Sequence, residues 1–253
     1  QYNAYLDKVG SYSFLQTSKM NEVLKSNNRE TKLLALVESG EILAVGLAFL
    51  RNIFGGKRID FMVGASSIDE KYEYIFYKLR AYVKDLDCLK LVIKLDKDYI
   101  IYDQEGEVLS KKDTSYIDKM KKIGYLENDG SIPASDGSPD YQFVKDLSEF
   151  IPDKDGKLLK SFNSNARRKI KKAKELDIKV RPIKRDELEE FKALTYETAE
   201  RQGFGDKSLK YYQTFYDEFS DNAEFLVSEI NLDHSIKKLK EIVAGMDPNA
   251  KNN

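Results

Sequence analysis

Apolar residues recur along this chain in two different spacings, and these spacings predict where its helices and strands lie. Steps of three and four residues are typical of a helix with one buried face, whereas short apolar stretches bounded by glycine and polar residues are typical of strands. The helical spacing occupies residues 13–28, 68–86, 116–125, 161–175, 186–203 and 208–219. The predicted strands are 31–40, 41–56, 57–64, 88–96, 141–148, 177–183 and 223–231.

The order of these elements predicts the fold class. A helix, antiparallel strands, a helix and a further strand form a mixed α/β pattern, that is, α+β with mixed sheets. The pattern then starts again, so we expect two similar α/β halves that join near residues 151–160. The strand predicted at 223–231 has no strand after it, and the second half is therefore expected to be incomplete.

The segment 161–175 combines a helical repeat with concentrated positive charge. From just before this segment, apolar residues recur at steps of three or four: Leu159, Phe162, Ala166, Ile170 and Ala173. The side-chain oxygens of Ser161, Asn163 and Ser164 are suited to cap the start of a helix. Residues 160–174 carry seven Lys or Arg and no acid, although the formal net charge of the chain is only -1.

This charge distribution predicts a helix that packs on one side and attracts polyanions on the other. Phosphate backbones are the commonest polyanions that proteins bind. The alternative interpretation is a solvated helix face whose lysines pair with nearby acids.

Composition excludes several kinds of site. The 253 residues are 41 % hydrophobic and 34 % charged, as in a folded protein with a heavily solvated surface. No apolar stretch approaches the roughly 20 residues that cross a bilayer. A single cysteine, Cys88, and a single histidine, His234, exclude an internal disulfide and a zinc site of the usual Cys and His ligands. We expect Cys88 to be a packed thiol in a reducing cytoplasm, and any catalysis to depend on carboxylates, tyrosines, lysines or binding alone.

Three stretches of the chain resemble the FemABX aminoacyltransferases. Residues 13–25 look like the N-terminal Gln-Thr/Ser helix of that family, and residues 55–96 resemble its strand, glycine turn, helix and strand. The strongest likeness covers residues 144–219, where the family also has a basic helix, a Val-rich strand, an acidic helix and a Tyr-Tyr helix. The resemblance therefore extends over most of the chain and does not depend on one motif.

The resemblance implies two acetyltransferase-like (GNAT-like) domains and a helical coiled-coil arm. On this basis the first GNAT-like domain is expected at 1–157, and the first part of the second domain at 158–232. Residues 233–253, whose apolar spacing predicts a helix, resemble the start of the arm. The later strands of the family, with their glycine-rich signature, are not in this sequence, and we expect catalytic residues to lie there.

The resemblance also implies an activity. The family transfers an amino acid from aminoacyl-tRNA to the stem-peptide amine of a muramyl-pentapeptide precursor, in the formation of peptidoglycan cross-bridges. Attack of an amine on an activated ester needs positioning above all, so neither a cofactor nor a metal is expected. We expect a cytoplasmic protein, which a lipid-linked precursor would bring to the inner face of the membrane.

The likeness assigns two groups of binding residues. For the tRNA phosphates these are Arg167, Arg168, Lys171 and Lys172 on the basic helix. Contacts of this kind supply affinity and strong salt dependence but no sequence information.

For the peptidoglycan precursor the assigned residues are Lys25, Lys210, Tyr211 and Tyr212. The family often has an arginine two residues after the second tyrosine, and here that position is Thr214, which argues against diphosphate binding by this helix. The competing interpretation of Tyr211 and Tyr212 is ordinary packing of an amphipathic helix.

Two other functions remain open at this point. An acetyl-CoA-dependent GNAT acetyltransferase needs a phosphate-cradling glycine turn at the start of a helix, and the Gly-Gly pair at 55–56 has neither that spacing nor a following helix. A noncatalytic RNA-binding module built around the basic helix would bind RNA without transferring an acyl group.

Overall fold

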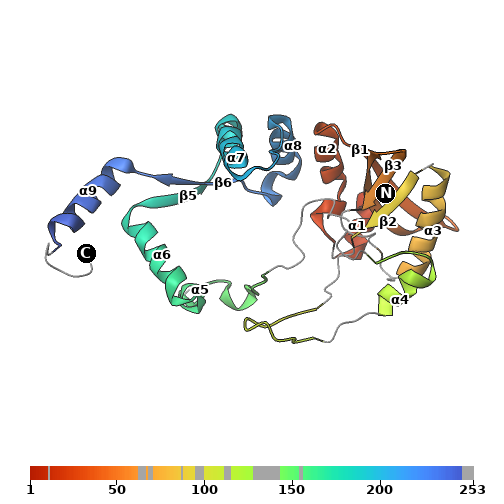
Figure 1. The fold of residues 1–253 in the computed structure, drawn as a ribbon, viewed down its shortest axis with the longest axis horizontal. Coiled ribbons are helices and arrows are strands. Elements are labelled where there is room, and N and C mark those ends of the chain that lie inside the picture. The colour runs from red at the N-terminus through yellow and green to blue at the C-terminus, as the bar shows by residue number, and fades with distance from the viewer. Residues whose placement is uncertain are drawn as a thin grey trace. The chain divides into compact units, whose positions relative to one another are not determined.

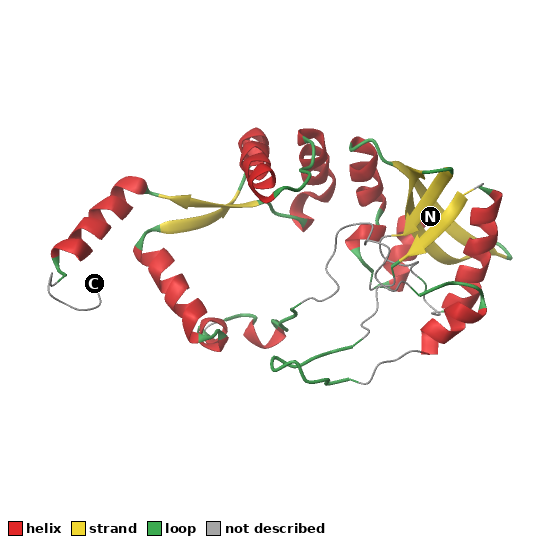
Figure 2. Ribbon diagram, viewed as in Figure 1, coloured by secondary structure: helices red, strands yellow, loops and turns green. Residues whose placement is uncertain are grey.

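The computed structural model divides the chain into two compact units, which are described separately. The first comprises Gln1–Asp140 and Thr195–Ser220, and the second comprises Tyr141–Leu194 and Asp221–Asn253. The structure describes residues 1–10, 12–61, 67, 71–86, 88–94, 100–110, 115–127, 143–153 and 156–246. Helices and strands alternate along the chain, so the predicted mixed α/β class is confirmed (Figures 1 and 2).

The first unit is built on a four-stranded sheet with the strand order β1-β2-β3-β4. The strands are β1 (Glu30–Glu38), β2 (Glu41–Ile53), β3 (Gly56–Phe61) and β4 (Cys88–Ile93). β1, β2 and β3 pair antiparallel, and β4 pairs parallel to β3. The parallel pair needs a crossover connection, which contains helix α3 (Tyr72–Asp85). All four strands predicted in this part of the sequence are present.

A two-residue turn joins β1 to β2. Ser39 and Gly40 both have positive φ, 51° and 84°. Turns of this kind match the right-handed twist of the two strands, and glycine adopts positive φ without steric cost. The strands predicted at 31–40 and 41–56 are therefore confirmed, and they form an antiparallel hairpin.

Helices cover both faces of the sheet. Val45 of β2 packs against Tyr5 and Leu6 of helix α1 (Tyr2–Val9). The preceding residue, Ala44, faces the opposite side of the sheet and packs against Ile75 of α3. This alternation follows from the two-residue period of a strand. Helix α4 (Ser115–Lys122) also belongs to this unit. α3 and α4 correspond to the helices predicted at 68–86 and 116–125, whereas α1 was not predicted.

The predicted helix at 13–28 is divided into two parts. A short 3-10 helix, η1 (Phe14–Gln16), ends at Thr17, and α2 (Ser18–Ser26) follows. The side chain of Thr17 accepts a hydrogen bond from the amide of Met20 at 3.2 Å, and so it serves as the N-cap of α2. The break allows the buried Gln16 to accept a hydrogen bond from the amide of Leu47 on β2, at 2.9 Å.

The second unit contains a two-stranded antiparallel sheet of β5 (Ile178–Pro182) and β6 (Leu226–Ile230). Its helices are α5 (Lys157–Ser161), α6 (Ser164–Glu175) and α9 (Leu232–Ala244). α7 (Leu188–Gln202) begins in this unit and ends in the first, to which α8 (Leu209–Phe219) belongs. The strand predicted without a following partner, 223–231, thus pairs with the strand that precedes it.

The strand predicted at 141–148 is wrong over residues 143–148, which the structure describes. Residues 143–147 of the segment 141–148 have no regular structure and are exposed, and a 3-10 helix, η2 (Ser148–Phe150), follows. The short apolar stretch has no strand beside it within the described residues, so its spacing alone does not produce a strand. Residues 141–142 lie outside the described ranges.

Other predictions about organisation remain predictions. The GNAT-like boundaries at 1–157 and 158–232 and the coiled-coil arm at 233–253 are among them. Helix α9 does form in this last segment, and it begins at the N-cap Asn231, whose side chain accepts from the amide of His234. Among the helices of the described ranges, none has the length and apolar composition needed to cross a bilayer.

Candidate functional site

Helix α8 packs against α2 in the first unit, although about 180 residues separate them in the chain. At one end of the pair, the Ser208 hydroxyl donates a hydrogen bond to Oδ1 of Asn27 at 3.2 Å. At the other end, the ring of Phe14 contacts the ring of Phe219 edge to face, with centroids 5.8 Å apart. The last turn of α2 therefore lies beside the first turn of α8, and the two helices run antiparallel.

The four residues predicted to bind the precursor lie on this helix pair. Lys25 is in the last turn of α2, while Lys210, Tyr211 and Tyr212 are in the first turn of α8. Both lysines are exposed and both tyrosines are half-buried. The structure thus brings together, at one end of the pair, residues that are far apart in the sequence.

Lys25 has an acidic neighbour on its own helix. Its Nζ atom lies 3.0 Å from Oε1 of Glu22, and both side chains are about half exposed. An exposed pair of this kind contributes little to stability, because water and salt screen it. The ammonium group is therefore available to a ligand that offers a stronger negative charge than one carboxylate.

Tyr211 lies in a cluster of aromatic rings. Its ring meets that of Tyr212 edge to face, with centroids 5.7 Å apart, and the ring of Phe215 at 6.1 Å. The ammonium of Lys207 lies 5.6 Å from the ring centroid of Tyr211. Burial raises the pKa of the Tyr211 phenol. These contacts fit the packing interpretation of Tyr211, and they add Lys207 to the cations at this end of α8.

Tyr212 takes part in a polar network that the sequence analysis did not identify. Its hydroxyl donates a hydrogen bond to Oδ1 of Asp206 at 2.8 Å, and the hydroxyl of Thr195 donates to Oδ2 of the same carboxylate at 3.1 Å. Burial, above all, raises the pKa of Tyr212 to about 12. Because Asp206 lies in a loop between two helices and has no periodic pattern around it, sequence spacing gave no signal for this network.

The basic helix predicted at 161–175 forms as α6, and it begins at 164. Asn163 is its N-cap and accepts a hydrogen bond from the amide of Ala166 at 2.8 Å. Its apolar face is only partly covered, since Ala166, Ile170 and Ala173 are half-buried. Leu159 and Phe162 belong instead to the short helix α5 and to the break between the two helices.

All four residues predicted to contact tRNA phosphates are exposed on α6. Arg168 donates a hydrogen bond to Oδ1 of Asn165 at 3.2 Å, and Lys171 lies 3.8 Å from Oε1 of Glu175. Arg167 reaches the carbonyl oxygen of Lys160 at 3.5 Å. These contacts are local and leave the positive charge of the helix face, which Lys172 shares, largely uncompensated. The α6 residues belong to the second unit and the precursor residues to the first.

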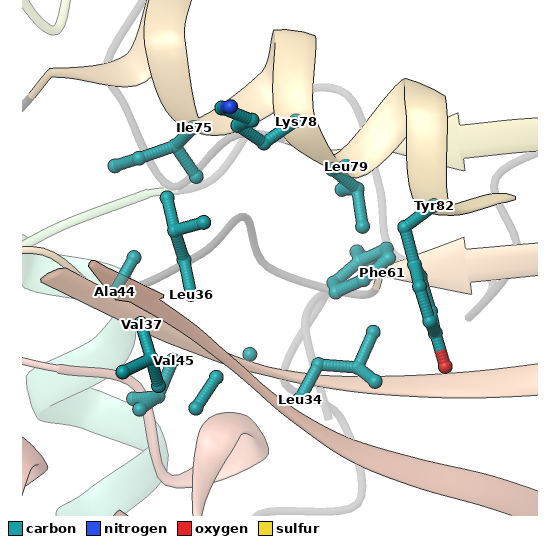
Figure 3. Close-up of a pocket in the computed structure, with 12 residues that line it drawn as sticks. Leu34, Leu36, Val37, Ala44, Val45, Phe61, Ile75, Lys78, Leu79 and Tyr82 are labelled. Atoms are coloured by element: carbon teal, nitrogen blue, oxygen red, sulfur yellow. The ribbon is translucent and has the colours of Figure 1, made fainter. Parts of the chain in front are cut away.

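The first unit also contains an apolar pocket of about 420 Å³ between α3 and the sheet. Ile75, Leu79 and Tyr82 of α3 point toward Leu34 and Leu36 of β1 across it (Figure 3). Lys78 and Tyr82 are the polar side chains in its lining, and the eight predicted binding residues, all of them described, lie elsewhere. The pocket therefore lacks the carboxylates and the cationic cluster that a polyanionic substrate or an acyl transfer would need.

The sequence matches the model of a known protein family. Residues 1–252 match the sequence model of the FemAB family. Two relatives named "Aminoacyltransferase FemA", from Staphylococcus aureus strains bovine RF122 / ET3-1 and N315, are each 27 % identical over 247 residues, which is 95 % of this chain and 56 % of theirs. The chain thus spans about half the length of the curated relatives it matches.

The fold has a counterpart among solved structures. The structure described as "Crystal structure of FemX" is similar with a TM-score of 0.59 and 19 % sequence identity, over 96 % of this chain and 60 % of that one. At this identity the likeness concerns the mixed α/β fold.

Proposed function

Because the chain belongs to the FemAB family, we propose that the protein is an aminoacyltransferase that adds an amino acid from aminoacyl-tRNA to the stem-peptide amine of a peptidoglycan precursor. The name of the relatives, aminoacyltransferase, is one support for this function. The observation that carries the proposal is the gathering of Lys25, Lys210 and the two tyrosines at one end of the α2–α8 pair, in a different compact unit from the basic helix α6.

Two separate cationic surfaces suit an enzyme with two anionic substrates. On α6, the face with Arg167, Arg168, Lys171 and Lys172 would bind the phosphates of the tRNA. Each neutralised phosphate releases counterions, so this binding would weaken steeply as salt increases.

The end of the α2–α8 pair would bind the precursor. Lys25 and Lys210 supply positive charge there, although Thr214 stands where the family often has an arginine. The first backbone amides of α8 point toward its N-terminal end, which also favours an anion. A muramyl-pentapeptide precursor carries a diphosphate, whether it is linked to a lipid or to a nucleotide. A lipid-linked precursor would bring the protein to the inner face of the membrane.

The reaction itself makes modest chemical demands. The neutral acceptor amine attacks the ester carbonyl of the aminoacyl-tRNA and a C–N bond forms. The C–O bond to the tRNA ribose breaks, the amine loses one proton and the ribose oxygen gains one, so the products are an amide and a free ribose hydroxyl. Holding the two reactants in the right geometry can contribute roughly 7–11 kcal/mol to such a step. Positioning by two binding surfaces is therefore an appropriate main contribution of the protein.

A direct test is transfer of a radiolabelled amino acid from a pool of charged tRNAs to muramyl-pentapeptide acceptors by the full-length gene product. The proposal predicts incorporation that requires both substrates. It also predicts a steep loss in the Arg167/Arg168/Lys171/Lys172 quadruple alanine variant. A control variant with alanine at Lys8, Lys84, Lys119 and Lys122, four exposed lysines of the first unit, removes the same charge and should retain activity.

The exposed cationic face of α6 also favours a second candidate function, a noncatalytic RNA-binding module. Charged-tRNA binding without incorporation from any charged tRNA would contradict the transferase and leave this alternative.

A further inference from the structure

The apolar pocket between α3 and the sheet exists because β2 carries small residues beneath the helix. Ala44 and Gly46 face α3, and they pair across the strands with Leu36 and Leu34 of β1. Their small size leaves a volume of about 420 Å³ unfilled, and Figure 3 shows it between α3 and the two strands. Small-molecule sites in proteins have volumes of roughly 300–1,000 Å³, so the pocket is large enough to hold a ligand.

The lining of this pocket is apolar, and the pocket opens at the edge of the sheet. Ile75 and Leu79 of α3 point into it (Figure 3). β1 is the edge strand among the described residues, and there Val37 and Tyr82 are 55 % and 38 % exposed. None of the described lining residues is an acid. The pocket therefore suits a ligand that is mainly apolar and that reaches solvent beside β1.

The two ends of the pocket differ in their polar surroundings. At one end, the ammonium of Lys78 lies 5.2 Å from the ring centroid of Tyr74, whose hydroxyl donates a hydrogen bond to Glu38 at 2.7 Å. A carboxylate of the protein is thus already present near this end. At the other end, the ring of Tyr82 extends from α3 beside Leu34, with its hydroxyl at the tip (Figure 3).

Lys32 adds a positive charge at the Tyr82 end. Side chains of a strand alternate between its two faces, so Lys32 lies on the same face of β1 as Leu34. It is half-buried and forms no ion pair within the described ranges, whereas its neighbour Glu30 is paired with Lys57 at 2.8 Å. A lysine stem can cover apolar surface while its ammonium stays in water. This end of the pocket therefore offers a cation and a hydroxyl to an anionic group.

We propose that the pocket binds a single-chain amphiphile with an anionic head, namely a free fatty acid. The alkyl chain lies between α3 and β1, and the carboxylate meets Lys32 and the Tyr82 hydroxyl at the open edge. The proposal goes beyond the proposed function and does not depend on it, because none of the eight residues predicted to bind tRNA or the precursor lines this pocket.

Calorimetry on the full-length protein tests the proposal with two amphiphiles of similar chain length, laurate and dodecyltrimethylammonium, each below its critical micelle concentration. Laurate should bind saturably at one site. The cationic amphiphile should bind at least about tenfold more weakly, because its head cannot accept the charged hydrogen bond that Lys32 donates. No saturable binding of laurate, or comparable affinities for the two amphiphiles, would overturn the proposal.

Lys32→Gln tests the position of the head group, because it removes the charge and keeps a long polar side chain. It should weaken laurate binding about three- to tenfold, as expected for the loss of one charged contact. Lys90→Gln is the matched control, since Lys90 is a half-buried lysine of β4 that pairs with Arg58 on the opposite face of the sheet. Equal effects of the two variants on laurate would contradict the proposal.

Leu36→Trp tests the position of the chain, because its larger ring occupies the pocket. It should abolish saturable binding of laurate and leave the melting temperature at or above that of the wild type, as filling a cavity does. Leu33→Trp places the same ring on the other face of β1 and should retain binding. Full laurate affinity in a folded Leu36→Trp variant would rule the pocket out. If that variant does not fold, the two lysine variants decide.

Vesicles of phosphatidylglycerol distinguish a free amphiphile from a bilayer as the source of the anionic chain. The proposal predicts that laurate binds in the absence of any vesicle. A protein that sediments with the vesicles but has no affinity for monomeric laurate would have a membrane-binding surface here, and the proposal would be wrong. The transfer assay of the proposed function is independent of each of these outcomes.

Discussion

Arg58 donates two hydrogen bonds to a single oxygen of Asp60, from Nε at 2.8 Å and from Nη2 at 2.5 Å to Oδ1. Arg58 and Asp60 lie on the same face of β3. Arg51 is the cross-strand neighbour of Arg58 on β2, and its Nε lies 3.0 Å from Oδ2 of Asp60. Asp60 is fully buried, and the side chain of Arg58 is nearly so. One buried carboxylate therefore lies against two guanidinium groups, the nearly buried one of Arg58 and the partly exposed one of Arg51.

Asp60→Ala should strongly destabilise the first unit. Removing the carboxylate leaves Arg58 buried without its counter-charge, which typically costs about 3–5 kcal/mol. Chemical unfolding followed by circular dichroism measures this loss. Asp85→Ala, at an exposed position at the end of α3, should change the free energy of unfolding by less than about 0.5 kcal/mol. Similar small changes in both variants would show that the cluster does not stabilise the fold.

Gly46→Ala should also destabilise the first unit, for a steric reason. A Cβ atom at Gly46 would lie 2.9 Å from Cε1 of Phe61, a ring that is buried on the α3 side of the sheet. Overpacking of this kind costs about 1–3 kcal/mol. Gly205→Ala, whose Cβ would meet no atom within 4 Å, is the matched control and should be close to neutral. An equally neutral Gly46→Ala would mean that Phe61 can move aside.

The cationic face of α6 should dominate the salt dependence of RNA binding. We assume that Arg167, Arg168, Lys171 and Lys172 each contact one phosphate. Their replacement by alanine should then make the slope of log K against log salt concentration less negative by about 3, because each phosphate contact contributes roughly 0.7–0.9 to it. Filter binding of tRNA between low and physiological salt measures this slope. The Lys8/Lys84/Lys119/Lys122 alanine variant has the same charge change and should keep the original slope. Equal reductions in the two variants would attribute the effect to net charge alone.

Glu187 should make the second unit sensitive to acid. Arg181 donates hydrogen bonds to both oxygens of Glu187, at 2.6 and 2.8 Å, and also binds Glu229 of β6. The hydrogen bonds from Arg181 lower the pKa of Glu187 to about 2. Because this pKa is depressed in the folded chain, the stabilisation is present above the ordinary glutamate range and is lost as the pH falls from about 4.5 toward 2.

Unfolding measured as a function of pH tests this contribution. Glu187→Gln should lower stability at neutral pH and flatten the decline between about pH 4.5 and 2. Glu190→Gln alters an exposed acid on α7 and should retain the decline of the wild type. An unchanged acid profile in Glu187→Gln would mean that other carboxylates govern the acid sensitivity.

Local patterns in the sequence were sufficient for much of the secondary structure. The hairpin of β1 and β2 follows from two apolar stretches around Ser39 and Gly40, and the N-cap of α6 follows from a suitable side chain at Asn163. Such features depend on interactions between residues a few positions apart. The contact of Gln16 with a strand about thirty residues away, which the break at Thr17 allows, escaped prediction because it is not local.

The sequence by itself determined the mixed α/β class, most of its helices and strands, the concentration of charge on α6 and the resemblance to a family. Tertiary structure alone decided that α8 lies against α2, that β6 pairs with β5, and that Asp206 holds Tyr212 and Thr195. The physical reason is the range of the interactions. The spacing of apolar residues shows which face of a helix or strand is buried, but it does not specify which distant segment packs against that face. The candidate precursor site belongs to this second class, because packing between segments brings Lys25 to the same end of a helix pair as Tyr212.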